Sequence, residues 1–107
     1  MKLLIIEDEL SLQEMMSTTL RKEGYIVECA STYASAIEKL GNYSYDCLLL
    51  DITLPDGNGL DILREIKKSG KEVNVIITSA RDSIDDKIEG LELGADDFVV
   101  KPFEMKE

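Results

Sequence analysis

The chain contains no histidine among its 107 residues, so histidine can be neither a nucleophile, nor a general base, nor a metal ligand here. Its two cysteines, Cys29 and Cys47, lie far apart in the sequence and form no CxxC motif. This spacing predicts two ordinary reduced thiols rather than a disulfide or a zinc site. Any chemistry must therefore come from carboxylates, hydroxyls and amines.

Basic residues are also scarce. Twelve lysines and arginines stand against 22 aspartates and glutamates, which gives a net charge of -10. This charge repels phosphate backbones and anionic lipids, so we expect the chain itself to bind neither nucleic acid nor a membrane. Long hydrophobic runs are missing too: the first apolar run, residues 3–6, is too short for a signal peptide or a membrane span. We therefore expect a cytoplasmic location.

The length predicts one domain with a single modest core over residues 1–107. Short apolar runs alternate with longer segments of helical period, which is typical of β-α units around a parallel sheet. We expect five strands, at residues 3–6, 25–29, 47–50, 73–78 and 98–100.

A fifth helix should cover the last strand, but only residues 103–107 remain after it. We therefore expect the chain to be truncated before or within that helix and to contain no output domain.

Four helices are predicted between these strands. Their apolar positions at helical spacing are Leu12, Met15, Met16 and Leu20; Tyr33, Ala36, Ile37 and Leu40; Leu60, Leu63 and Ile66; and Ile84, Ile88 and Leu91. Each helix is expected to stop at a glycine, namely Gly24, Gly41, Gly70 and Gly94 in chain order. Either Ser31 or Thr32 can cap the second helix. The whole pattern predicts an open, doubly wound α/β sheet.

Polar side chains follow the predicted strands at one end. Glu7 and Asp8 close the first strand, Asp51 the third, Ser79 the fourth and Lys101 the fifth. In open parallel sheets ligands bind beyond the carboxyl ends of the strands, so we expect these five side chains to converge on one edge. Taken alone, Glu7 and Asp8 could instead cap the first helix, and Lys101 could be a solvated lysine.

Three carboxylates in one place require a proton or a cation. Two unit charges about 4 Å apart repel by roughly 4 kcal/mol at an effective dielectric constant of 20. Because only oxygen ligands are on offer, the expected ion is Mg²⁺ or Mn²⁺ rather than zinc. Lys101 can pair with Asp51 at rest and with a phosphoryl oxygen later, while the Ser79 hydroxyl can donate to another oxygen. These residues predict phosphoryl transfer to the Asp51 carboxylate, which is already ionised and needs no base.

The motifs resemble those of receiver domains in bacterial two-component response regulators, over essentially the whole chain. They are residues 4–9 (LIIEDE), 50–57 (LDITLPDG) with Gly59, 77–80 (ITSA), 94–98 (GADDF) and 101–103 (KPF). The resemblance implies a flavodoxin-like parallel sheet with strand order 2-1-3-4-5. It also implies that Asp51 accepts a phosphoryl group from a sensor histidine kinase in the presence of Mg²⁺ or Mn²⁺.

The resemblance assigns roles to single residues. Asp8, Asp51 and the backbone carbonyl of Thr53 would bind the metal, with Glu7 supporting it. Ser79 and Lys101 would contact the phosphoryl group. Phe98 would be a switch aromatic that turns inward as the Ser79 hydroxyl moves toward the phosphate, although Phe98 could also be an ordinary half-buried edge-strand residue.

Residues 86–97 resemble the OmpR/PhoB-type subfamily, whose receivers dimerise through the fourth helix, the fifth strand and the fifth helix. Lys87, Glu92 and Asp97 match charged positions of that face, although they could simply form a solvated surface. The resemblance implies a homodimer of the full-length protein and a downstream DNA-binding domain beyond this chain.

Three other functions compete. An interaction domain of the same fold that is never phosphorylated would lack an acid, the hydroxyl or the lysine, and all of them are present here. A flavin or nucleotide site would need Gly, Ser or Thr after the first strand, where residues 7–9 read EDE. A phosphatase or phosphomutase with an aspartate nucleophile would need a second acid at the position of Thr53.

Overall fold

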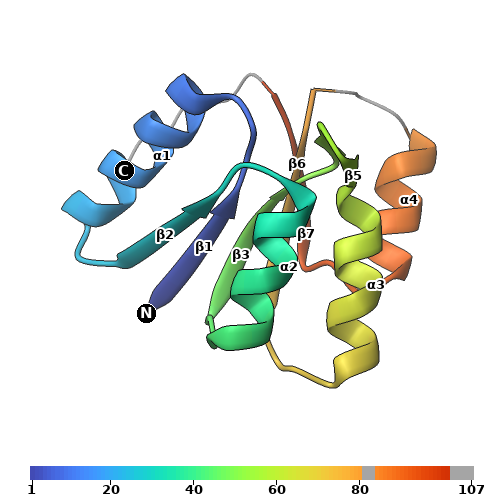
Figure 1. Ribbon diagram of the computed structural model, residues 1–107. Helices are drawn as coiled ribbons and strands as arrows, with labels where there is room; N and C mark the ends of the chain where they lie inside the picture. The colour runs from blue at the N-terminus through green and yellow to red at the C-terminus, as the bar shows by residue number, and fades with distance from the viewer. Residues whose placement is uncertain (81–83, 102–107) are drawn as a thin grey trace.

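The computed structural model describes residues 1–80 and 84–101, which form the predicted α/β sheet (Figure 1). The strands of the main sheet are β1 (Lys2–Ile6), β2 (Ile26–Ala30), β3 (Cys47–Asp51), β6 (Asn74–Ser79) and β7 (Asp97–Val100). All neighbouring pairs are parallel, and the spatial order is β2-β1-β3-β6-β7. Counted along this sheet alone, that order is the predicted 2-1-3-4-5.

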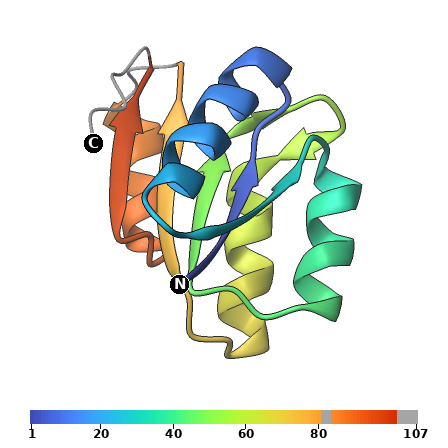
Figure 2. The same cartoon turned by 90° about the vertical axis from the view of Figure 1, so that its left-hand side faces the viewer.

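Helices pack on both faces of the sheet. They are α1 (Leu10–Lys22), α2 (Tyr33–Asn42), α3 (Gly59–Ser69) and α4 (Ile84–Glu92). Within the described ranges α1 covers one face, and α2, α3 and α4 cover the other (Figures 1 and 2). Because successive strand residues point to opposite faces, β1 supplies Leu4 and Ile6 to the core under α2 to α4, and Leu3 and Ile5 to the smaller core under α1. No helix in the described part of the chain is long and apolar enough to span a bilayer.

A short antiparallel hairpin, which the sequence did not predict, lies between β3 and α3. Its strands are β4 (Thr53–Leu54) and β5 (Gly57–Asn58). Leu54 is buried in the larger core, and the Asn58 side chain caps α3 by accepting a hydrogen bond of 2.8 Å from the Leu60 backbone N–H. The segment after Asp51 therefore has a fixed conformation.

Several predicted boundaries need correction. Helix α2 does not stop at Gly41 but runs on to Asn42, and Thr32 rather than Ser31 caps it, accepting the Ser35 backbone N–H at 3.0 Å. Strand β2 starts one residue later than predicted, because the Tyr25 N–H still bonds to the last turn of α1. The other three predicted glycines do follow their helices with positive φ, as the sequence indicated.

Helix α4 turns a different side to the sheet than its apolar period indicated. Ile84, Ile88 and Leu91 are 73%, 50% and 42% exposed, and Met15 on α1 is exposed as well. The buried residue of α4 is Gly90, where an added Cβ would lie 2.6 Å from Cδ1 of Ile77. The glycine lets the helix backbone approach the sheet, and this contact orients the isoleucines outward.

Two glycines should respond oppositely to alanine. A Cβ on Gly59 would overlap the backbone carbonyl oxygen of Asp51, whereas a Cβ on Gly41 would meet nothing within 4 Å. We expect Gly59→Ala to lower the free energy of unfolding by at least about 2 kcal/mol, because the clash is with backbone. Gly41→Ala, inside a helix, should raise it by up to about 1 kcal/mol. Urea denaturation followed by circular dichroism checks both, and equal effects of the two substitutions would contradict the packing described.

Candidate functional site

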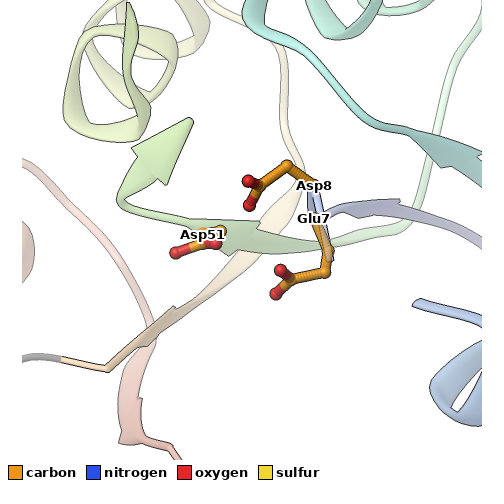
Figure 3. A group of neighbouring side chains, drawn as sticks. All are labelled: Glu7, Asp8 and Asp51. Atoms are coloured by element: carbon orange, nitrogen blue, oxygen red, sulfur yellow. The ribbon is translucent and has the colours of Figure 1, made fainter. Parts of the chain in front are cut away.

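Three carboxylates meet where β1 and β3 end (Figure 3). Ile6 pairs with Leu50 in the parallel ladder, so the residues that follow β1 lie beside the last residue of β3. One oxygen from each of Glu7, Asp8 and Asp51 lies within 4.8 Å of the others. Glu7 and Asp51 are only 1% and 4% exposed, whereas Asp8 is open to solvent. Among the described residues this is the only such cluster of potential metal ligands.

The backbone after β1 is held by a dense set of hydrogen bonds. The Glu7 N–H donates to the Ala30 carbonyl at 3.0 Å, and the Glu7 carboxylate accepts the Glu9 N–H at 3.0 Å. The side-chain amide of Gln13 donates to the Glu7 carbonyl at 2.8 Å. The N-cap position of α1 belongs to Glu9, which makes no side-chain capping bond, so the alternative that Glu7 and Asp8 cap this helix is wrong.

Lys101 bridges two of the carboxylates. Its Nζ lies 2.6 Å from Oε1 of Glu7 and 3.2 Å from Oδ2 of Asp51. Its backbone N–H donates to the Ser79 carbonyl at 2.7 Å, which continues the β6-β7 pairing past the end of β7. Sequence reasoning anticipated the contact with Asp51 but missed the shorter one with Glu7. No local sequence pattern predicts the Lys101–Glu7 contact, because the lysine side chain extends from the edge strand β7 back toward the end of β1.

The charge around Asp51 shifts its ionisation. Burial and the neighbouring Glu7 carboxylate raise the pKa of Asp51 to about 6, although Lys101 and the Thr53 backbone N–H oppose the shift. Burial alone would lower the pKa of the Lys101 ammonium, but its hydrogen bond to Glu7 and the charge of Asp51 outweigh this and raise the pKa. Lys101 therefore stays charged, while Asp51 is mainly ionised at neutral pH and takes up a proton as the pH falls through about 6.

The cluster suits a small, hard divalent cation. Its ligands are carboxylate oxygens, which Mg²⁺ and Mn²⁺ prefer, and the Lys101 ammonium, the one that contacts the cluster among the described residues, leaves part of the negative charge unbalanced. Thr53 lies next to Asp51, with its N–H 3.2 Å from the Asp51 carboxylate. The role of the Thr53 carbonyl as a metal ligand stays a prediction.

The other predicted residues lie at differing distances from this cluster. Ser79 is fully buried at the end of β6, one position beyond Thr78, the partner of Asp51 in the ladder. Phe98 faces the larger core and is buried rather than half-buried. The three charged residues of the predicted dimer face, Lys87, Glu92 and Asp97, are exposed on α4 and at the start of β7. Their roles stay predictions.

Two residues that the sequence did not single out hold the backbone of the site. Gln13 links α1 to Glu7 and also donates to the Ser31 hydroxyl at 3.2 Å. Asp56 links the β4-β5 hairpin to α2 through two backbone N–H groups. In the sequence Gln13 is one of many polar helix residues and Asp56 one residue of a turn, so neither gave a usable signal.

In metal-free buffer, Asp51→Asn should make the fold more stable at neutral pH. The pKa of Asp51 is about 6 in the folded chain and near 3.8 when unperturbed, so its stabilising contribution is complete below the lower value and is lost as the pH rises through the higher one. The advantage of the asparagine variant should grow to at most about 3 kcal/mol, because one pKa unit corresponds to about 1.4 kcal/mol. Urea denaturation in EDTA from about pH 5 to about pH 8 measures it. A difference between the two proteins that does not vary with pH would contradict the account.

Comparisons with known proteins agree with this geometry. The family model of the response regulator receiver domain matches residues 3–107. The chain is 40% identical over 107 residues to the two-component response regulator PhoP of Pseudomonas aeruginosa and 43% identical to the transcriptional regulatory protein PmrA of Pectobacterium parmentieri. It covers 48% of each, so it spans about half the length of these curated relatives.

A solved structure supports the same assignment. The non-phosphorylated receiver domain of HemR from Leptospira biflexa is 34% identical, with a TM-score of 0.91 over 96% of this chain and 83% of that one. PhoP and PmrA are regulators of the OmpR/PhoB family, the subfamily that the sequence resembles. With a family match over nearly its whole length, the chain belongs to the response regulator receiver domain family.

Proposed function

We propose that this chain is a phosphoacceptor module, in which Asp51 takes a phosphoryl group from a sensor histidine kinase in the presence of Mg²⁺ or Mn²⁺. The observation that carries the proposal is the position of the Asp51 carboxylate. It is buried beside Glu7 and Asp8, and the Lys101 ammonium lies 3.2 Å away. Membership of the receiver family supports the same reading.

The transfer needs no general base. A carboxylate oxygen of Asp51 would form the new P–O bond while the P–N bond of the kinase phosphohistidine breaks, leaving the electron pair on the imidazole nitrogen. The Lys101 ammonium, already beside the nucleophile, would pair with a phosphoryl oxygen as charge builds there. The Ser79 hydroxyl would hold another phosphoryl oxygen.

Asp8, Asp51 and the Thr53 carbonyl would hold the metal, with Glu7 supporting them. The bound ion would supply positive charge to the phosphoryl oxygens. The side chains explain the need for it, because in the described part of the chain Lys101 is the one ammonium seen at the cluster, and it contacts only Glu7 and Asp51 among the three carboxylates. Without further positive charge, a phosphoryl dianion could not approach Asp51 closely.

The chain would not be an enzyme acting on a separate substrate. Asp51 would be consumed on phosphorylation and restored when water attacks the acyl phosphate. The same groups that align the phosphoryl group could align that water, so the module would assist both its own phosphorylation and its own dephosphorylation.

The signal would leave the site through Ser79 and Phe98 toward α4. The Phe98 ring lies beneath α4, since its Cδ2 is 3.8 Å from the position of a Cβ on Gly90. A rotation of this ring would therefore change its packing against α4 and shift the helix. The outer side of α4 carries Lys87 and the exposed Ile88.

In the longer protein, this surface would change its contacts with a partner when Asp51 is phosphorylated. Lys87, Glu92 and Asp97, exposed on α4 and β7, would contribute to a homodimer of the full-length regulator. The dimer would control a DNA-binding domain outside residues 1–107, in the cytoplasm. The net charge of -10 supports the absence of direct nucleic-acid contact by the receiver itself.

Phosphorylation by a small acyl phosphate tests the proposal directly. With acetyl phosphate and Mg²⁺, intact-protein mass spectrometry should show the addition of one phosphoryl group, and EDTA should abolish it. Asp51→Asn should gain none, whereas Asp61→Asn, which removes an exposed carboxylate on α3, should gain as much as the unchanged chain. A non-phosphorylated interaction domain of the same fold would show no gain, and a gain that survives Asp51→Asn would sink the assignment of the acceptor.

A further inference from the structure

Asp56 joins the hairpin that follows Asp51 to the start of α2. One oxygen of its carboxylate accepts the Tyr33 backbone N–H at 2.6 Å, and the other accepts the Ala34 N–H at 3.1 Å. These are the first two residues of α2, whose N–H groups have no partner within the helix. The same hydrogen bonds lower the pKa of Asp56, so its exposed carboxylate is ionised at neutral pH and keeps both bonds.

Direct packing presses the hairpin against the same helix. A Cβ on Gly57 would lie 2.7 Å from Cδ2 of the Tyr33 ring, so only glycine allows this approach. The carboxylate of Asp56 and the backbone of Gly57 thus meet two neighbouring residues of α2. One end of the hairpin is fixed relative to the helix in both direction and distance.

The other end of the hairpin is fixed to the phosphoacceptor strand. The Gly59 N–H donates to the Ile52 carbonyl at 2.6 Å, and the Thr53 N–H donates to the Asp51 carboxylate at 3.2 Å. Thr53 and Leu54 therefore lie between two anchors, one at Asp51 and one at α2. Release of the α2 anchor would leave the Thr53 peptide held by its bond to Asp51, by the β4-β5 pairing and by the burial of Leu54.

Capping alone does not explain Asp56, because α2 has a cap of its own. The Thr32 hydroxyl accepts the Ser35 N–H at 3.0 Å, and Thr32 is the N-cap residue. Thr32 precedes the helix directly. Asp56 instead lies in the hairpin, 23 residues after Tyr33 and 22 residues after Ala34, the two residues whose N–H groups it accepts. The distinct effect of Asp56 is to connect the two segments.

We infer that Asp56 is a positioning residue that clamps the β4-β5 hairpin onto the N-terminus of α2 and thereby holds Thr53 and Asp51 ready for a divalent cation. The inference rests on the proposed function, since it concerns the same metal site. Asp56 would not touch the ion. It would raise the affinity for the ion because less backbone has to be ordered when the ion binds.

Mn²⁺ binding, followed by electron paramagnetic resonance of the free ion, tests the clamp without any phosphoryl chemistry. We expect Asp56→Ala to weaken Mn²⁺ binding by about tenfold, at the low end for groups that orient metal ligands from behind. Asp56→Asn keeps one acceptor oxygen, but its NH2 group cannot accept the second N–H, so this variant should recover only part of the lost affinity. Two controls should bind Mn²⁺ like the unchanged chain: Thr32→Ala removes the local cap of α2, and Glu38→Ala removes one exposed negative charge from the same helix.

Amide hydrogen exchange in metal-free buffer gives a second readout. The N–H groups of residues 53, 54 and 56–58 should exchange faster in Asp56→Ala but not in Thr32→Ala, because only the first substitution removes hydrogen bonds between the hairpin and α2. This readout distinguishes the clamp from a general loss of helix stability.

The outcomes separate the two claims. If the unchanged chain binds no Mn²⁺, both the metal site and the clamp are wrong. If it binds Mn²⁺ and Asp56→Ala binds equally well, the clamp alone is wrong. If Thr32→Ala loses as much affinity as Asp56→Ala, the effect belongs to α2 and the clamp is overturned as well.

Discussion

The ion pairs of the Lys101 ammonium with the clustered carboxylates of Glu7 and Asp51 are the interaction on which the rest of this structure depends. Lys101 lies between Glu7 and Asp51, with Asp8 close by on the solvent side. Within residues 1–80 and 84–101, the one positive charge that contacts the cluster does not balance its three negative ones, and the buried members of the cluster lack the screening of water. The site therefore opposes folding, and its repulsion must be offset by the two apolar cores. The same unbalanced negative charge favours the binding of a cation at the site.

The parallel sheet makes such a cluster possible. Glu7, Asp51 and Lys101 are far apart in the chain, but each follows or ends a strand, and parallel strands end at the same edge. The ladder register sets the positions of the side chains, and the apolar residues of the same strands hold the register by packing under the helices. Backbone bonds from Gln13 and Asp56 then fix the two loops that carry the acids. Stability and site geometry thus come from the same strands.

The residue pattern predicted the strands and the edge on which Glu7, Asp51 and Lys101 gather, while the strand order was implied by the family resemblance. It succeeded there because apolar runs and strand ends are local features whose consequence is fixed by the parallel topology. It failed for α4, where periodicity showed an apolar stripe but not that Gly90 would take the contact with the sheet. It also missed the Lys101–Glu7 contact and the Asp56 clamp, since both depend on how side chains reach between segments distant in the chain.

The most direct test of this charge balance is a side-chain carboxyl titration of Asp51 by ¹³C nuclear magnetic resonance, with and without saturating Mg²⁺. The account predicts a pKa for Asp51 of about 6 in metal-free buffer, because burial and Glu7 oppose ionisation. Bound Mg²⁺ should move the pKa well below that value, since the ion favours the charged carboxylate. A metal-free pKa near the ordinary 3.8, unchanged by Mg²⁺, would contradict the account.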